Sequence, residues 1–363
     1  MSKKLLKVLL DYDDVLAMCN AFALEIINST RNPSEPFDVR NIKGFGYDDG
    51  TLEERIKFFN DPEFVMAQPL FPGAKEFIHE LSKKVEIFIG SAVPPQCMSA
   101  RAMRVVQDFP EIKPENIILG TSKHIYDVDV MLDDSPRNFL KSNATYPVLM
   151  RRPWNEQVSG ILAVNNYEDF LHLIDTLVSA DDEPDLSSGG ILCLVGPSGS
   201  GKNTITENLI QDNRFEKPIA TTTREKHENE NENNYNFISE KEFIVNSANF
   251  VETTVYGGYH YGISAEQIDN IISQNKIAVL PCDICGGITI KNKYRSKALL
   301  VFVDRTKQDI ILNILKKSCS DEQKALRIVS LENEFKNETL CDITVRNDGN
   351  IDDVAAEIKK IIF

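Results

Sequence analysis

The sequence predicts an α/β protein with two domains, each built on a mainly parallel sheet flanked by helices. Short apolar runs alternate with stretches of helical periodicity along the whole chain, an order typical of parallel sheets. The 363 residues are too many for one small domain and sufficient for two of ordinary size. The runs predicted as strands are residues 6–10, 85–89, 117–119, 130–132 and 148–150 in the first half, and 191–195, 277–280 and 299–303 in the second.

A linker is predicted at residues 179–189, between a first domain at 1–178 and a second at 190–363. It has four acids, one proline and a single large apolar residue, so it cannot bury a core. The apolar spacing before it predicts the helix that closes the first domain, with Phe170, Leu171, Ile174, Leu177 and Val178 on one face.

Composition narrows the classes of function. The chain carries 40 Lys and Arg against 55 Asp and Glu. A division at residue 180 gives 19 basic and 26 acidic residues in the first part, and 21 basic and 29 acidic residues in the second. Both halves are therefore acidic, which disfavours nucleic acid as a partner. No apolar run is long enough for a membrane span, no signal peptide is recognisable, and seven scattered cysteines suggest reduced thiols. We expect a cytoplasmic protein without a membrane partner.

Acidic residues follow two strands predicted in the first half. Asp11 and Asp13 come directly after residues 6–10, and Asp133 and Asp134 come after residues 130–132. The carboxyl ends of parallel strands meet at one edge of a sheet, so these acids can share a cleft. One aspartate could attack phosphorus while another exchanges a proton with the leaving oxygen, and carboxylate oxygens are suitable magnesium ligands.

A serine and a lysine add to this pattern. Ser91 follows residues 85–89 and could donate a hydrogen bond to a phosphate oxygen. Lys123 could neutralise a transferred phosphoryl group, and Arg101 or Arg104 could take the same role. The alternative is a solvated group of acids at strand ends, which the ordered set disfavours.

The ordered set resembles the haloacid dehalogenase superfamily of aspartate-nucleophile phosphatases over about residues 5–178. The segments Pro-Gly-Ala at 72–74, Asp-Asp-Ser-Pro at 133–136 and Arg-Pro-Trp-Asn at 152–155 resemble its 5'-deoxyribonucleotidase branch. The resemblance implies a Rossmann-like fold with a small helical cap at about residues 15–70. It makes Asp11 the nucleophile and Asp13 the general acid/base, with phosphate bound by Ser91 and Lys123. The implied magnesium ligands are among Asp11, Asp13, Asp133 and Asp134, with either Asp133 or Asp134 completing the site. Asp14 stands where this family usually has glycine.

A phosphate-binding loop is predicted at residues 196–202, Gly-Pro-Ser-Gly-Ser-Gly-Lys. It follows an apolar strand and opens an amphipathic helix, so backbone N–H groups can surround phosphates while Lys202 reaches the outer ones. Asn203 follows the lysine where such loops have Ser or Thr, so a magnesium ion there would bind through water or Thr204. The candidate ATP-binding residues are Gly196, Ser198, Gly199, Ser200, Gly201, Lys202, Asn203 and Thr204.

Downstream residues resemble guanylate kinase over about residues 190–363, which implies a P-loop nucleoside monophosphate kinase fold. The matching segments are Thr-Thr-Thr-Arg at 221–224, Tyr-Asn-Phe at 235–237, Phe-Val-Glu at 250–252, Gly258, Tyr-Gly at 261–262 and Asp-Ile-Cys-Gly at 283–286. The resemblance implies an acceptor phosphate held by Arg224, Tyr235 and Tyr261. It also implies a base read by Glu252 and Asp283, because guanine offers two donors that carboxylates accept and adenine does not.

Several positions depart from the guanylate kinase pattern. His227 replaces a phosphate-binding arginine, Ala220 or Thr221 replaces a base-contacting serine, and Pro281 replaces an acid. The lid that stabilises charge during transfer is poor in arginine: the candidates are Lys316, Lys317 and Arg327.

These patterns together predict a bifunctional nucleotide enzyme that uses Mg²⁺ and ATP and acts on nucleoside monophosphates. One half would be a magnesium-dependent 5'-nucleotidase that forms an aspartyl-phosphate, and the other would phosphorylate GMP or dGMP. One alternative is a polynucleotide kinase/phosphatase, which the acidic charge disfavours. The other is a kinase-like domain that binds a nucleotide or partner without turnover.

Overall fold

A computed structural model describes residues 5–44, 49–156, 158, 161–178, 183–226, 235–256, 259–317 and 320–363. His227, Gly258 and residues 179–182 of the expected linker lie outside the described residues. The chain divides into two compact units, Met1–Val158 with Ala163–Ile174, and Ser159–Leu162 with Asp175–Phe363.

The first unit is built on a six-stranded parallel sheet with the strand order β3-β2-β1-β4-β5-β6. The apolar runs form strands because both faces of a parallel sheet are covered, and Leu10 and Leu132 in its centre are fully buried. The strands are β1 Lys7–Asp11, β2 Glu86–Ser91, β3 Ile117–Leu119, β4 Val130–Asp133, β5 Tyr146–Met150 and β6 Ala163–Val164. The five strands predicted in this half are confirmed, and β6 was not predicted.

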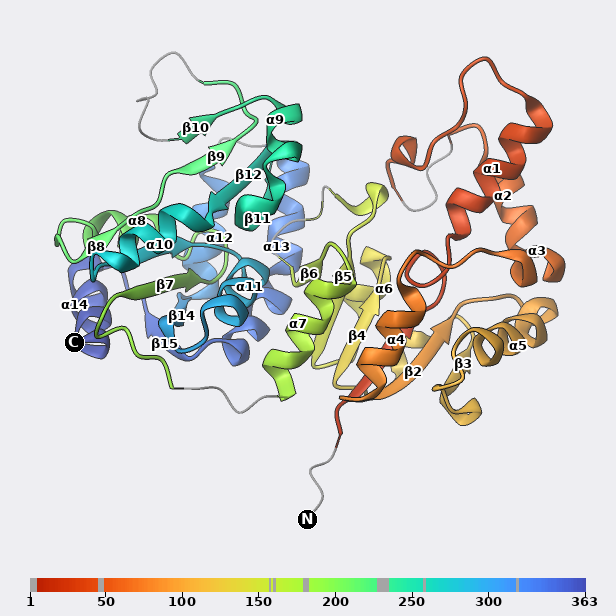
Figure 1. Ribbon diagram of the computed structural model, residues 1–363, viewed down its shortest axis with the longest axis horizontal. Coiled ribbons are helices and arrows are strands. Elements are labelled where there is room, and N and C mark those ends of the chain that lie inside the picture. Colours follow the sequence, from red (N-terminus) through yellow and green to blue (C-terminus); the bar gives the residue numbers. More distant parts are fainter. Residues whose placement is uncertain are drawn as a thin grey trace. The chain divides into compact units, whose positions relative to one another are not determined.

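Amphipathic helices cover this sheet (Figure 1). The helix predicted to close the first half is α7, which buries Phe170, Leu173 and Ile174. The covering helices are α4 Ala74–Ser82, α5 Met98–Asp108, α6 Pro136–Lys141 and α7 Tyr167–Val178.

A helical insert follows β1, and Figure 1 shows its first two helices apart from the sheet of the first unit. Aromatic side chains form its core: the ring of Phe64 stacks on those of Phe22 and Phe58, at 5.2 and 5.3 Å between centroids. The insert contains α1 Cys19–Arg31, α2 Leu52–Phe59 and α3 Pro62–Ala67. This insert, which we call the cap, is the segment for which the family resemblance implied a cap at about residues 15–70.

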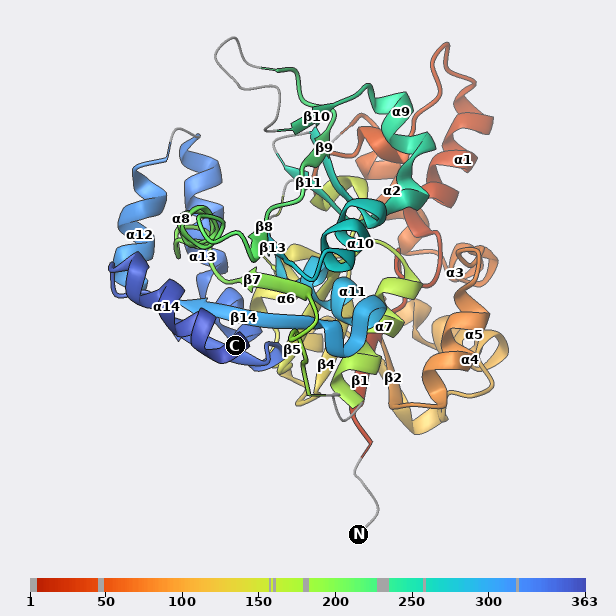
Figure 2. The same cartoon turned by 60° about the vertical axis from the view of Figure 1, so that its left-hand side comes forward.

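The second unit has a five-stranded parallel sheet with the order β15-β14-β7-β13-β8. Its strands are β7 Gly190–Val195, β8 Phe215–Glu216, β13 Ile277–Pro281, β14 Ala298–Asp304 and β15 Ile343–Arg346, and the three predicted ones are confirmed. Helices α12 and α13 pack on each other, as Figure 2 shows. The helices of this part are α8 Lys202–Leu209, α10 Ala265–Ser273, α11 Ile284–Tyr294, α12 Lys307–Leu315, α13 Asp321–Lys336 and α14 Ile351–Ile362.

A second, mixed sheet in this unit was not predicted. Its order is β10-β9-β12-β11, with β9 and β10 parallel and the other pairs antiparallel. It comprises β9 Ala220–Thr222, β10 Tyr235–Phe237, β11 Phe250–Tyr256 and β12 Tyr259–Ser264, with α9 Glu240–Val245 between β10 and β11. In the part of the chain that the structure describes, no helix is both long and apolar enough to span a bilayer.

Candidate active sites

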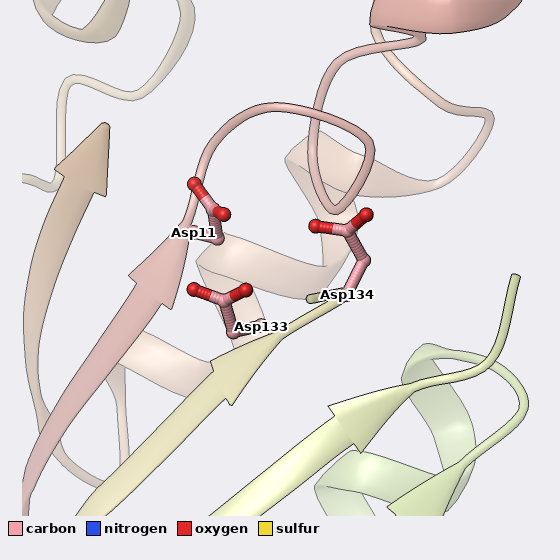
Figure 3. Close-up of side chains that lie close together, drawn as sticks. All are labelled: Asp11, Asp133 and Asp134. Carbon is pink, nitrogen blue, oxygen red and sulfur yellow. The ribbon is translucent and has the colours of Figure 1, made fainter. Parts of the chain in front are cut away.

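The carboxyl ends of β1 and β4 bring three aspartates together. The two strands are neighbours in the sheet, with Leu10 paired to Leu132, so the residues that end them share one edge. Asp11 ends β1, Asp133 ends β4 and Asp134 follows it. Figure 3 shows their carboxylates around one space beyond the strand ends, and one oxygen of each lies within 4.8 Å of the others. All three residues are buried.

Lys123 places a positive charge inside this aspartate cluster. It begins a short 3-10 helix, and its Nζ lies 2.5 Å from Asp11 Oδ2 and 3.0 Å from Asp133 Oδ2. Burial lowers the pKa of the Lys123 ammonium, but the two carboxylates outweigh this effect and raise the pKa above its usual value. Burial raises the pKa of Asp11 well above its usual range, and Lys123 opposes the rise. The lysine therefore favours the ionised form of Asp11 that a nucleophile requires.

Asp134 is held by the segment at residues 152–155. The indole Nε1 of Trp154 donates to Asp134 Oδ2 at 2.8 Å, and Asn155 Nδ2 donates to the backbone oxygen of Asp134 at 2.8 Å. Burial, then the charge of Asp133, raises the pKa of Asp134 well above its usual range. Sequence reasoning used this segment as a family signature and missed that Trp154 orients an acid of the cluster.

The donor set of the aspartate cluster fits a divalent metal ion. Three ionised carboxylates carry three negative charges, and Lys123 offsets one of them. Buried charges without compensation are costly, so the site favours a cation with two positive charges. Carboxylate oxygens are also the ligands that Mg²⁺ prefers. Asp11, Asp133 and Asp134 would hold such an ion, whereas Asp13 lies outside the cluster.

Asp13 instead pairs with an arginine of α5. Its Oδ1 lies 2.5 Å from Nη2 of Arg101, and its Oδ2 accepts a hydrogen bond from Ser91 Oγ at 2.8 Å. Arg101 is fully buried, with its guanidinium 4.0 Å from the centroid of the Tyr12 ring. Of the two arginines considered from the sequence, Arg101 is therefore in the site. Arg104 bonds instead to Asp108 and to the backbone oxygens of Met66 and Gln68 at the end of α3.

A cavity of about 570 Å³ lies between the carboxyl edge of the sheet and the cap. Such a volume is within the range of small-molecule sites. Its core side includes Asp11, Asp13, Arg101, Lys123 and Asp134, and its cap side includes Cys19, Asn20, Phe59, Asn60, Val65 and Gln68.

In the second unit, residues 196–202 form a loop between β7 and α8. Gly196, Gly199 and Gly201 have φ values of 144°, 98° and 103°, which glycine adopts with little strain. Two asparagines, both missed from the sequence, fix the loop. Asn347 Nδ2 donates to the backbone oxygen of Ser200 at 2.7 Å, and Asn313 Nδ2 donates to that of Gly199 at 2.9 Å.

Three cations lie at this loop. Lys202 Nζ donates to the backbone oxygens of Gly196 and Pro197, at 2.5 and 3.1 Å, and burial lowers its pKa. Ser198 Oγ accepts hydrogen bonds from Lys317 Nζ at 2.7 Å and Arg327 Nη1 at 2.9 Å. Lys317 and Arg327, two of the three lid candidates, are thus at the loop, whereas Lys316 is exposed. Asn203 and Thr204, at the start of α8, are also exposed.

A glutamate of α13 also reaches the loop, although no sequence pattern indicates it. The Glu334 carboxylate is buried and accepts hydrogen bonds from Ser330 Oγ at 2.7 Å and from the backbone N–H of Ser198. Burial raises the pKa of Glu334 to about 6, while Lys202 and Arg327 oppose the rise.

A second cavity, of about 470 Å³, joins the phosphate loop to the residues expected to bind the acceptor. Glu252 on β11 and Asp283 before α11 both line it, although 31 positions separate them in the chain. Burial, then the charge of Asp283, raises the pKa of Glu252 to about 8. The site residues that line this cavity are Gly196, Ser198, Lys202, Asn203, Tyr235, Glu252, Tyr261, Asp283 and Arg327.

Four residues singled out from the sequence of the second unit differ in their relation to this cavity. Asp283 Oδ1 accepts from the backbone N–H of Gly286 at 2.8 Å, so this carboxylate also caps α11. Arg224 lies over the rings of Tyr235 and Phe237, at 5.4 and 5.5 Å, and does not line the cavity. Ala220 and Pro281, two departures from the family pattern, do line it.

Comparison with known proteins assigns one family model to each half. Residues 189–363 match the model for guanylate kinase. Residues 4–181 match the model for 5' nucleotidase, deoxy (pyrimidine), cytosolic type C protein.

Two guanylate kinases agree with the match of the second half. The guanylate kinase of Mycoplasmopsis pulmonis is 33% identical over 184 residues, which cover 48% of this chain and 93% of that protein. The guanylate kinase of Wolinella succinogenes is 31% identical over 168 residues, which cover 44% of this chain and 78% of that protein. Among solved structures, a HAD-type hydrolase from Bacillus subtilis bound to magnesium is 14% identical. That match covers 48% of this chain and all of the other, with a TM-score of 0.32.

Proposed function

The chain belongs to the guanylate kinase family through residues 189–363, and from this premise we propose that its second domain transfers a phosphoryl group from ATP to GMP or dGMP. With a nucleotidase family match over residues 4–181, the chain is a bifunctional nucleotide-metabolism enzyme of phosphatase and kinase type. For the first domain we propose magnesium-dependent hydrolysis of nucleoside 5'-monophosphates, with deoxynucleotides as the favoured substrates.

One observation carries the kinase proposal: a single cavity contains both the phosphate loop and the carboxylates of Glu252 and Asp283. Guanine has an N1–H and an exocyclic amine, which two carboxylates can accept, whereas adenine has an acceptor at N1. The two guanine donors would favour the ionised form of Glu252, whose pKa burial raises to about 8, whereas adenine offers only its exocyclic amine as a donor. The pair therefore favours guanine.

The loop supplies the second requirement of the kinase reaction, which is charge stabilisation. ATP phosphates placed on the loop would meet backbone N–H groups at the start of α8 and the ammonium of Lys202. Lys317 and Arg327, already at Ser198, would stabilise the charge that develops on the transferred group.

The phosphatase proposal depends on the buried aspartate cluster with Lys123. The carboxylate of Asp11 would attack phosphorus, the bond to the ester oxygen would break, and an aspartyl-phosphate would form. Asp13 would give a proton to the leaving oxygen and then take one from the water that hydrolyses the intermediate. Ser91 and Lys123 would orient the phosphate. Bound magnesium would neutralise the phosphate charge.

Because a phosphatase and a kinase share one chain, we expect the two domains to prefer different nucleotides. A phosphatase and a kinase acting on one monophosphate would consume ATP without net product. We therefore propose that the first domain acts mainly on nucleotides that the second does not phosphorylate.

The test is a panel of GMP, dGMP, AMP, CMP and UMP, incubated with the full chain and Mg²⁺, with and without ATP. We expect diphosphate formation from GMP and dGMP at least about tenfold faster than from AMP, and phosphate release without ATP. Glu252→Gln should reduce the guanine preference and leave the affinity for ATP unchanged. Equal use of AMP and GMP by the wild type would refute the reading of guanine by carboxylates.

A second candidate function is a kinase-like domain that binds nucleotides without turnover. The position of Lys202 favours it, because its ammonium is engaged with loop carbonyls. ATP binding without diphosphate formation from any monophosphate in the panel would support this alternative.

A further inference from the structure

Asp14 is a buried residue in a backbone conformation that suits glycine. It follows Asp13 at the start of the cap, its φ is 54°, and it is 5% exposed. Few residues other than glycine adopt this region without strain, although Asp and Asn tolerate it best. A buried acid in such a position requires contacts that stabilise it.

Its side chain provides these contacts through the first helix of the cap. Asp14 Oδ1 accepts a hydrogen bond from the backbone N–H of Asn20 at 3.0 Å, and Oδ2 accepts one from Asn20 Nδ2 at 2.6 Å. Both groups of one asparagine on α1 therefore bind both oxygens of this carboxylate, which fixes the orientation of the helix start.

The network continues from Asn20 to the second helix of the cap. Asn20 Oδ1 accepts from Arg55 Nη1 at 2.8 Å, and Arg55 lies on α2 and is buried. The same guanidinium donates from Nε to Thr51 Oγ1 at 3.0 Å and lies 3.3 Å from Asp49. A continuous chain of hydrogen bonds thus runs from the catalytic loop to α1 and α2.

The backbone of Asp14 is fixed on the side of the sheet. Its oxygen accepts a hydrogen bond from Arg152 Nε at 2.6 Å, and Arg152 stacks on the Phe71 ring at 4.3 Å. Its N–H donates to the backbone oxygen of Ala17 at 2.8 Å. Asp14 is therefore anchored to the core through its backbone and to the cap through its carboxylate.

The helices that Asp14 holds also form one side of the substrate cavity. Asn20 on α1 lines it, as do Phe59 and Asn60 at the end of α2. Ser91 and Lys123, which would bind the phosphate, lie on the core side of the cavity. The nucleoside part of a bound nucleotide would therefore extend to the cap, whereas a small phosphate ester would bind without reaching it.

We propose that Asp14 is a positioning residue that holds α1 and α2 of the cap over the cavity and thereby selects nucleotides over small phosphate esters. This inference rests on the proposed phosphatase function of the first domain. It concerns the selectivity of that site and leaves its chemistry to the aspartate cluster.

The test compares kcat and KM for a deoxynucleoside 5'-monophosphate and for p-nitrophenyl phosphate in the wild type and in Asp14→Gly. Glycine adopts the local φ freely, so the variant should fold. Loss of the two hydrogen bonds between Asp14 and Asn20 corresponds to a loss of about tenfold, so the ratio of kcat/KM between nucleotide and aryl ester should fall about tenfold. Most of this fall should come from a higher KM for the nucleotide. An unchanged ratio overturns the proposal.

Two further variants make the test specific. Asn20→Ala should lower the ratio as Asp14→Gly does, and the double variant should lower it no further, because both remove one connection. If the effects of Asp14→Gly and Asn20→Ala on the ratio add in the double variant, the two residues do not act through one shared contact, and the proposal is overturned. Asn32→Gly is the matched control: it makes the same kind of change at an exposed cap residue with a φ of 44°, and its ratio should stay at the wild-type value.

The outcome separates this inference from the function on which it rests. A wild-type chain that releases no phosphate from any nucleotide or ester refutes the phosphatase proposal. A wild-type chain that is active, with a ratio that Asp14→Gly leaves unchanged, refutes the role of Asp14 alone.

Discussion

The Nζ of Lys123 lies 2.5 Å from the carboxylate of Asp11, and both side chains are buried at the carboxyl edge of the first sheet. The pair is the electrostatic centre of the proposed phosphatase site. The lysine favours the charged form of Asp11, the proposed nucleophile, and the remaining negative charge of the cluster favours a divalent cation.

Replacing Lys123 by Met should destabilise the metal-free protein, because Asp11 and Asp133 would then be buried without their cation. Removal of one partner of a buried pair costs about 3–5 kcal/mol of the free energy of unfolding. The pKa of Asp11 should rise further above its unfolded value. The contribution of Asp11 to stability is then present at low pH and lost as pH rises. The loss of stability in Lys123→Met, relative to the wild type, should therefore grow with pH. Thermal melting in a chelator at several pH values, with Lys141→Met at an exposed site as the control, checks this. A loss of stability in Lys123→Met that does not change with pH would contradict this role of Lys123.

Replacing Trp154 by Phe should weaken magnesium binding. The ring remains, but the indole N–H that holds Asp134 is lost, and loss of such an orienting group reduces metal affinity about 10- to 100-fold. The Mg²⁺ concentration that gives half-maximal phosphate release measures the change. Tyr167→Phe removes a donor to the backbone oxygen of Val15 and serves as the control. An unchanged Mg²⁺ dependence would remove Trp154 from the metal site.

Glu252 should make the stability of the nucleotide-free protein depend on pH. Its folded pKa of about 8 lies above the ordinary value of 4.5, so the folded state holds a proton that the unfolded state releases. Its contribution is therefore fully present below about pH 4.5 and is lost as pH rises toward 8. Glu252→Gln should flatten the pH dependence of the melting temperature over this range, and Glu266→Gln, at an exposed site, should not. Parallel curves for wild type and Glu252→Gln would contradict the burial of this acid.

Glu334 should couple ATP binding to protonation. Its pKa is about 6 in the empty site, and phosphates placed on the loop would raise it. The bound state then holds more protons, so the affinity of the wild type for ATP should increase as pH falls through 6. Titrations of Glu334→Gln should lack this component, whereas Glu332→Gln, an exposed glutamate paired with Lys307, should retain it. Identical pH profiles for wild type and Glu334→Gln would exclude the coupling.

The parallel sheets and the strand-end chemistry could be predicted from sequence because both follow local rules. Apolar runs such as 130–132 mark buried strands, and the acids after them must lie at a common edge. The loop at 196–202 is likewise a local pattern. These features are confirmed as strands, edges and a loop, while the roles of the residues remain predictions.

The features that could not be predicted depend on tertiary neighbours. Two strands of the mixed sheet, β9 and β10, have three residues each, which is too short for a periodicity to be detected. Glu334 reaches the loop only because α13 packs beside it, and a buried glutamate on a helix has no distinct sequence signal. Asp14 was visible as a departure from glycine, but its hydrogen bonds to Asn20 require the folded cap.

The most direct test of two separate active sites is one assay of both reactions on the full-length wild type, Asp11→Asn and Lys202→Ala. Asp11→Asn removes the attacking charge and should lower phosphate release at least about a thousandfold, with GMP phosphorylation retained. Lys202→Ala should abolish phosphorylation and leave phosphate release at the wild-type rate. A single substitution that silences both reactions, or substantial phosphate release by Asp11→Asn, would contradict the account.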